Sequence, residues 1–177
     1  NIVLSAEGEN EVVITAVNYA GGEYPLKLSY YKDSVAPSTN ITSYITDSDK
    51  TGFTNPKDID KSKLLGNNTW TKEKIYSVSI GQDNNSGIYK TGSYCTYDKS
   101  NDGIIYGDSG TTFDKNKYGI FLRYTKDAVD TISCVFSDNA GNISSPVTFN
   151  IKRDNTKPNL TLSSFKSKDL SKIENHT

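Results

Sequence analysis

Two polar segments recur along the chain at nearly the same spacing. The turn at 138–142, Asp-Asn-Ala-Gly-Asn, resembles Asn-Tyr-Ala-Gly-Gly at 18–22, which lies 138 − 18 = 120 residues earlier. The segment at 154–158, Asp-Asn-Thr-Lys-Pro, resembles Asp-Ser-Val-Ala-Pro at 33–37, which lies 154 − 33 = 121 residues earlier. Two matches with one residue of slip predict an internal structural repeat.

The repeat predicts how the chain divides. Residues 1–36 are expected to be the C-terminal strands of one module, and 37–158 one complete module with an inserted polar loop at 98–118. Residues 159–177 are expected to be a linker and the first strand of a following module. The sequence contains no methionine, so we expect this chain to be an internal piece of a longer protein.

Alternating apolar and polar residues, together with frequent turn residues, predict an all-β fold. Tyrosine is abundant, with 12 residues, and suits half-exposed sheet surfaces. Strand patterns separated by turn signals every 10–15 residues or so are typical of a β-sandwich. Strands are expected near 11–17, 24–31, 41–45, 70–80, 89–97, 104–106, 119–124, 131–136 and 147–151. A helical turn is expected within 55–65, and the 70–80 strand can place either Ile75 or Tyr76, Val78 and Ile80 inward.

Charge and composition argue against several classes of function. The net charge is −1, which gives no electrostatic reason to bind nucleic acid or an anionic membrane surface. No segment approaches the roughly 20 apolar residues of a membrane helix. The single histidine, His176, lies in a polar C-terminal tail, so no Ser-His or Cys-His catalytic pair is expected in a folded core. We therefore expect no enzyme activity in this piece.

The two cysteines, Cys95 and Cys134, leave two interpretations open. Their spacing fits no metal-binding motif and no redox pair. A disulfide between strands would indicate an oxidising, extracellular setting. Alternatively, each thiol is buried separately as a small apolar side chain.

Five turn residues carry oxygen ligands of the kind that Ca²⁺ takes: Asp83, Asp138, Asn139, Asn142 and Asp154. A calcium site at these turns is one hypothesis. The structural interpretation is that aspartate and asparagine bond to neighbouring backbone and that Gly141 adopts a positive φ. We favour the structural interpretation, with calcium as the only cofactor to be considered.

Exposed aromatic side chains could bind a glycan by stacking on sugar rings. The candidates are Trp70, Tyr94, Tyr97 and Tyr118. The simpler interpretation is that the tyrosines decorate sheet faces while Trp70 fills the core of the sandwich. The sequence favours this simpler interpretation.

The succession of a strand, Asp-Asn-Ala-Gly-Asn, a strand and Asp-Asn-Thr-Lys-Pro over 131–158 resembles the bacterial immunoglobulin-like modules found in tandem on large surface proteins. The turn at 83–88, Asp-Asn-Asn-Ser-Gly-Ile, resembles a turn of the same family. The resemblance implies an immunoglobulin-like β-sandwich, an extracellular or cell-surface location, and neighbouring modules of the same chain as partners. It also implies a structural or adhesive role that spaces or presents a surface for a host protein, cell-surface protein or glycan.

Two other functions remain open. The chain could be a glycan-binding accessory module of a secreted carbohydrate-active enzyme. It could also be a subunit of a surface filament or virion, whose partial modules are completed by strands from neighbouring chains.

Overall fold

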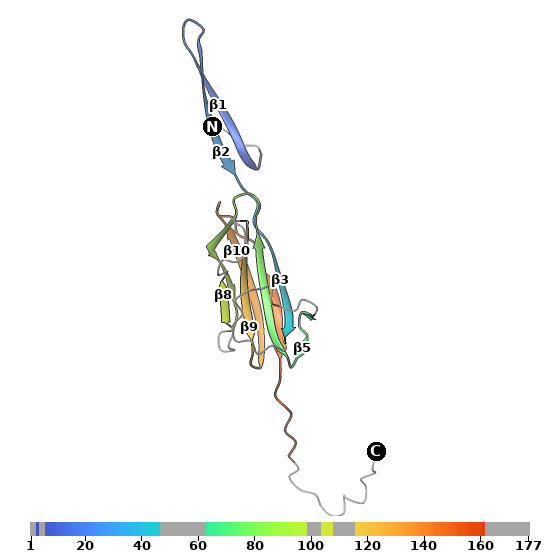
Figure 1. Ribbon diagram of the computed structural model, residues 1–177. Helices are drawn as coiled ribbons and strands as arrows, with labels where there is room; N and C mark the ends of the chain where they lie inside the picture. Colours follow the sequence, from blue (N-terminus) through green and yellow to red (C-terminus); the bar gives the residue numbers. More distant parts are fainter. Residues whose placement is uncertain (1–2, 4–5, 47–62, 99–103, 108–115, 162–177) are drawn as a thin grey trace, which may run out of the picture.

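The computed structural model describes residue 3 and residues 6–46, 63–98, 104–107 and 116–161. Over this part of the chain the protein is all-β, with no helix (Figure 1). The strands are β1 (Gly8–Val17), β2 (Glu23–Lys32), β3 (Ser38–Thr46), β4 (Leu64–Leu65), β5 (Trp70–Thr71), β6 (Lys74–Gln82), β7 (Ile88–Thr96), β8 (Ile104–Gly107), β9 (Lys117–Tyr124), β10 (Ala128–Asp138) and β11 (Val147–Arg153).

Two sheets pack together to form the body of the molecule. One has the strand order β5-β11-β10-β7 and the other the order β4-β3-β6-β9-β8. The pairings are antiparallel except that between β5 and β11, which is parallel. The expected β-sandwich character is therefore present. Strand β8 pairs with β9, so part of the expected loop at 98–118 belongs to the second sheet.

The main core lies between the two sheets. On β10, Ile132, Cys134 and Phe136 alternate with outward residues and are fully buried. Facing them, β6 and β9 contribute Ile75 and Leu122, which are also fully buried. The alternation in these strands places every second side chain in the core, as the period of a strand requires.

Strand β6 contributes to apolar clusters on both of its faces. Ile75 belongs to the main core, whereas Tyr76 and Val78 form a second cluster with Phe121 of β9. The sequence pattern at 70–80 allowed either face of this strand to point into the core. Both faces are used, since Ile75 on one and Tyr76 and Val78 on the other are all buried.

Several expected elements differ from those observed. The strand expected at 70–80 is two strands in different sheets, because the chain turns at Lys72 and Glu73 and passes from β5 to β6. Leu64 and Leu65, at the end of the expected helical turn, instead form β4 beside β3. The rest of that expected helical turn, up to residue 62, lies outside the described residues. Leu160 and Thr161 are described and are not in a strand.

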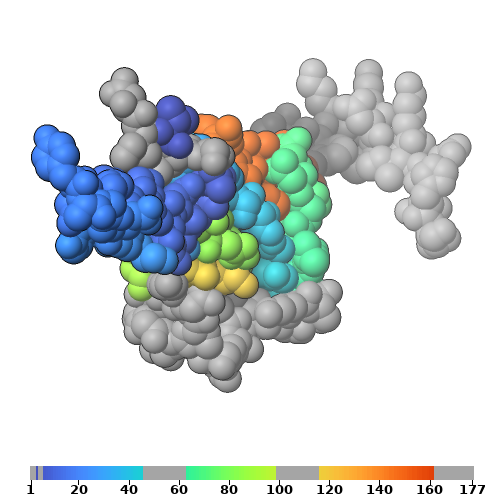
Figure 2. All heavy atoms as spheres, turned by 90° about the horizontal axis from the view of Figure 1, so that it is seen from above, coloured from blue at the N-terminus to red at the C-terminus, as the bar shows by residue number. Residues whose placement is uncertain are grey.

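A separate hairpin, β1–β2, projects from one end of the body (Figure 1). The chain leaves β11 at the opposite end. Seen from above, the blue atoms of the hairpin stand to one side of the body (Figure 2). Many of the hairpin's apolar side chains are exposed, including Ile14, Leu26 and Tyr30. Two strands alone bury little surface, so this hairpin depends on its attachment for a fixed position.

Candidate functional site

The turn that follows β10 is closed by the buried carboxylate of Asp138. Oδ1 of Asp138 accepts backbone N–H bonds from Ala140 (2.9 Å) and Asn142 (2.8 Å), and its Oδ2 accepts a hydrogen bond from the side-chain amide Nδ2 of Asn142 (2.8 Å). Gly141 completes the turn with a φ of 95°, a conformation that glycine adopts without a Cβ penalty. The structural interpretation of this turn accounts for each of these contacts.

A second turn, between β6 and β7, is built in the same way around Asp83. Its Oδ1 accepts backbone N–H bonds from Asn85 (3.0 Å) and Gly87 (2.8 Å). Asn139 ties the two turns together, because its Nδ2 donates to the carbonyl oxygens of Ser86 (2.9 Å) and Gly87 (3.1 Å). The amide of Asn139 thus acts as a donor in the described structure.

Asp33, in the linker between β2 and β3, joins both turns. Its carboxylate accepts hydrogen bonds from the backbone N–H of Ser86 (3.2 Å) and from Nδ2 of Asn85 (3.4 Å). Its carbonyl oxygen accepts a bond from Nδ2 of Asn142 (3.1 Å). Burial alone would raise the pKa of Asp33, but the hydrogen bonds from Ser86, Val35 and Asn85 outweigh it and hold that pKa below its ordinary value.

The linker brings three carboxylates together at this end of the body. Oxygen atoms of Asp33, Asp83 and Asp138 lie within 4.8 Å of one another. Such oxygens could act as ligands for a divalent cation. Each carboxylate also accepts at least one backbone N–H bond from its own turn or linker, and these local bonds account for its position without an ion.

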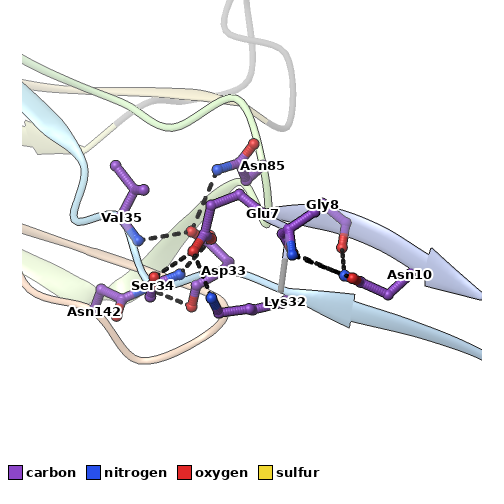
Figure 3. A network of polar contacts seen from close by, with 10 residues as sticks. Glu7, Gly8, Asn10, Lys32, Asp33, Ser34, Val35, Asn85 and Asn142 are labelled. Carbon is purple, nitrogen blue, oxygen red and sulfur yellow. Dashed lines mark hydrogen bonds and ion pairs between the residues drawn. The ribbon is translucent and has the colours of Figure 1, made fainter. Parts of the chain in front are cut away.

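The base of the hairpin is clamped to the same linker (Figure 3). Glu7 accepts hydrogen bonds from both the backbone N–H (2.8 Å) and the hydroxyl of Ser34, and it forms an ion pair with Lys32 at 3.3 Å. The hydroxyl and backbone bonds from Ser34 hold the pKa of Glu7 below its ordinary value. The joint between hairpin and body is therefore a continuous polar network from Glu7 to Asp138.

Asp154 does not join this cluster, although the sequence analysis grouped it with Asp83 and Asp138. It lies at the opposite end of β11, where its backbone N–H bonds to the carbonyl of Thr71 and its side chain accepts the N–H of Thr156 (2.9 Å). Asp33 takes its place in the cluster and was not among the residues expected there. The repeat contained the missing signal, because Asp33 and Asp154 are the 121-residue counterparts of each other.

Cys95 and Cys134 are joined by a disulfide. The two residues face each other directly on the neighbouring strands β7 and β10, so the bond links strands of one sheet and does not cross between the sheets. Cys134 is fully buried, and the hydroxyl of Ser79 lies 2.9 Å from its Sγ.

The four aromatic candidates separate into two pairs. Tyr97 and Tyr118 pack against the main core, and Tyr118 makes an edge-on contact with Phe136. Trp70 and Tyr94 are exposed, at 58% and 55% respectively. The expectation that Trp70 fills the core was therefore wrong: its strand is a two-residue edge segment, and its side chain points away from the sandwich interior.

Comparisons with protein-family models, with curated proteins and with solved structures found no match to this chain. Among the described residues, there is no helix whose length and apolar content would allow it to span a membrane.

Proposed function

We propose that this chain is a non-enzymatic structural and adhesive segment of an extracellular bacterial surface protein. In this proposal, immunoglobulin-like modules follow one another in tandem and hold a binding surface away from the cell. The neighbouring modules of the same polypeptide are the first partners of each module.

The strand order supports an immunoglobulin-like module. The order β3-β6-β9-β8 in one sheet and β11-β10-β7 in the other corresponds to the ABED and GFC sheets of immunoglobulin domains. The disulfide differs, because antibody domains link strands B and F across the two sheets whereas this chain links two neighbours within one sheet. The likeness to immunoglobulin domains therefore lies in the order of the strands and not in the position of the disulfide.

The observation that carries the tandem arrangement is a set of contacts that occurs twice. Asn18 closes its turn with backbone N–H bonds from Ala20 (3.0 Å) and Gly22 (2.8 Å), as Asp138 does 120 residues later. At the hairpin base, Glu7 binds Lys32 and Ser34; at the other end of the body, Asp127 binds Arg153, Asn155 and Thr156 in the same manner. This recurrence supports one module type used at least twice.

The two copies of this clamp lie at opposite ends of the body. The hairpin enters at one end and the chain leaves β11 at the other, as Figure 1 shows. Modules connected in this way extend along one line. A spacer needs this arrangement, together with joints that resist bending.

The spacer proposal is tested by the distance between the hairpin tip and the far end of the body. The described residues contain no free cysteine, so spin labels can be attached at Tyr19→Cys and Val129→Cys without removing the disulfide. We expect electron–electron double resonance to give one narrow distribution of distances between the two labels. In the double variant Glu7→Ala with Asp33→Ala, that distribution should become broader. If the distance distribution is already broad in the parent protein, and as broad as in the double variant, the spacer function is overturned.

A second candidate, assembly by strand addition, is favoured by the hairpin itself. Along β1 and β2, Val12, Ile14, Leu26 and Leu28 share one face by register, and Ile14 and Leu26 are exposed. In a filament subunit, strands from a neighbouring copy would cover this face. Sedimentation over a wide range of protein concentration tests it: assembly that Ile14→Ser abolishes supports strand addition, and a monomer throughout argues against it.

A further inference from the structure

We propose that the outer face of the sheet β5-β11-β10-β7 binds a neutral, β-linked oligosaccharide, with Trp70 and Tyr94 as the two stacking platforms. This inference goes beyond the spacer function, and neither its two platforms nor the strip of side chains between them takes part in the joint between hairpin and body. Its test can therefore fail while the spacer function holds, and the reverse is equally true.

Strand register places both aromatic side chains on one face. Trp70 pairs with Lys152 on β11, and Nζ of Lys152 lies 5.7 Å from the centre of the indole ring. Lys152 pairs in turn with Val129 on β10, two strands from the edge. At the other end of β10, Tyr94 of β7 pairs with Val135. Because Val129 and Val135 alternate with the inward-facing residues of β10, all these side chains point away from the core.

The strip between the two aromatic residues is made of hydroxyl and amide side chains. Its members are Thr96, Thr131, Ser133, Thr148 and Asn150. Oγ1 of Thr131 donates to Oδ1 of Asn150 at 2.9 Å, which fixes the orientation of two of them. Hydroxyl and amide groups of this kind exchange hydrogen bonds readily with the hydroxyl groups of a sugar.

The surface is hollowed beside Trp70. A hollow of about 270 Å³ lies among Asn68, Asp98, Val129, Asp130, Thr131, Asn150, Ile151 and Lys152. A second hollow, of about 420 Å³, is lined by Trp70 and Val129. Val129 thus lines both hollows. Both hollows lie at the Trp70 end of the face, over the first residues of β10 and the last residues of β11, where the first rings of a sugar chain could lie.

The dimensions of the face suit a chain and not a single sugar. From Val129 to Val135 the strand advances six residues, or about 20 Å, and the four strands span about 14 Å across the sheet. The platforms are therefore separated by the length of several sugar rings. A chain that contacts both must present flat apolar ring faces repeatedly, which β-linked pyranoses do.

The charge of the face selects a neutral ligand. The central strip carries no charged side chain, while Lys152 at one end is accompanied by Asp98 and Asp130. The hollow that Trp70 lines adds Arg153, Asp127 and Asp154. A polyanion such as nucleic acid or a uronic acid polymer would therefore find two cations and four carboxylates at this end of the face. A large protein partner is also disfavoured, because the centre of the face is hydroxyl-rich and lacks the apolar patch of a protein interface.

Intrinsic fluorescence provides a direct test, because Trp70 is the only tryptophan in the chain. The probes are β-1,4-linked hexaoses of glucose and of N-acetylglucosamine, with α-1,4-linked glucose hexaose and a uronic acid hexamer as comparison ligands. We expect a saturable change in Trp70 emission with at least one of the two β-linked chains and none with the comparison ligands. Absence of a saturable change with both β-linked chains would overturn the proposal.

Variants separate stacking from incidental contact. We expect Tyr94→Ala to weaken binding about tenfold, which corresponds to the loss of an aromatic contact of about 1.4 kcal/mol. The control Tyr19→Ala removes an exposed tyrosine at the hairpin tip and should leave affinity unchanged. Both variants retain Trp70 as the reporter, and their unfolding midpoints establish that each is folded. If Tyr94→Ala and Tyr19→Ala bind equally well, the two-platform site is wrong.

Discussion

At the scale of single residues, Asp138 and Asn18 show how burial changes the importance of one turn. Both accept N–H bonds from the residues two and four positions later. Asp138 is 1% exposed, whereas Asn18 is exposed in the projecting hairpin. In the exposed turn, water can replace the side chain as a hydrogen-bond acceptor. In the buried turn, removal of the acceptor leaves donors without a partner.

This difference gives a matched pair of substitutions. We expect Asp138→Ala to lower the free energy of unfolding by about 1–3 kcal/mol, because two part-buried backbone N–H groups and the side-chain amide of Asn142 lose a charged acceptor. Asn18→Ala removes the same two backbone contacts in water and should cost less than about 0.5 kcal/mol. Urea unfolding monitored by circular dichroism measures both. Equal effects from the two substitutions would show that the buried turn does not depend on its carboxylate.

A close contact in the core makes a second prediction at this scale. A Cβ on Gly81 would overlap the Phe136 side chain, because the Cβ, Cγ and Cδ1 atoms of Phe136 all lie closer to that position than real Cβ contacts allow. Phe136 is fully buried and cannot move aside into solvent. We therefore expect Gly81→Ala to destabilise the protein by about 1–3 kcal/mol through overpacking. Thr148→Ala, on the outer face of the other sheet, is the control and should have little effect on the unfolding midpoint.

At the scale of strands, the disulfide ties the edge strand β7 to its neighbour β10 in one sheet. It joins β7 to β10 across a sequence separation of 39 residues, and both sulfur atoms lie within the main core. Its loop includes β8 and β9, which belong to the opposite sheet. In the unfolded chain, this one bond therefore keeps segments from both sheets close to one another.

Reduction should therefore weaken the whole sandwich. The chain-entropy model gives about 4 kcal/mol for a loop of this length, and we expect Cys95→Ala with Cys134→Ala to lose about 2–4 kcal/mol. The unfolding midpoint of this double variant should match that of the parent protein in reductant. A parent protein whose midpoint is insensitive to reductant would contradict a disulfide in solution.

Much of the strand content followed from sequence, because alternation and turn residues are local signals. The strands near 131–136 and 147–151 are confirmed, with longer limits. The division of 70–80 between two sheets was missed, since the crossover takes only two residues, Lys72 and Glu73, and neither is the glycine or proline that usually marks a turn. Asp33 was missed because its partners are 50 and more residues away, a distance that local pattern does not report.

At the scale of the whole molecule, the orientation of the hairpin depends on ionised carboxylates. Asp33 connects the linker to the turn at Asn85 and Ser86, and Glu7 holds the hairpin base to Ser34. Apart from the Lys32–Glu7 ion pair, these contacts are hydrogen bonds to charged acceptors. Protonation of either carboxylate weakens them, so the joint and the sandwich need not respond to acid in the same way.

The sign of the pH dependence follows from the two depressed pKa values. Each carboxylate has a folded pKa below its ordinary value, 3.8 for Asp33 and 4.5 for Glu7. The stabilisation they provide is therefore complete above those ordinary values and is lost as pH falls through the lower folded values. We expect nitrogen-15 relaxation to show the hairpin tumbling with the body at pH 7 and independently of it in acid, once the pH has fallen below the lowered pKa values of both carboxylates. Asp33→Asn combined with Glu7→Gln should loosen the hairpin already at pH 7 while the amide spectrum of the body stays folded. If the hairpin in this variant remains as rigid as in the parent protein across the same pH range, the carboxylates do not fix the joint, and packing of the linker must do so.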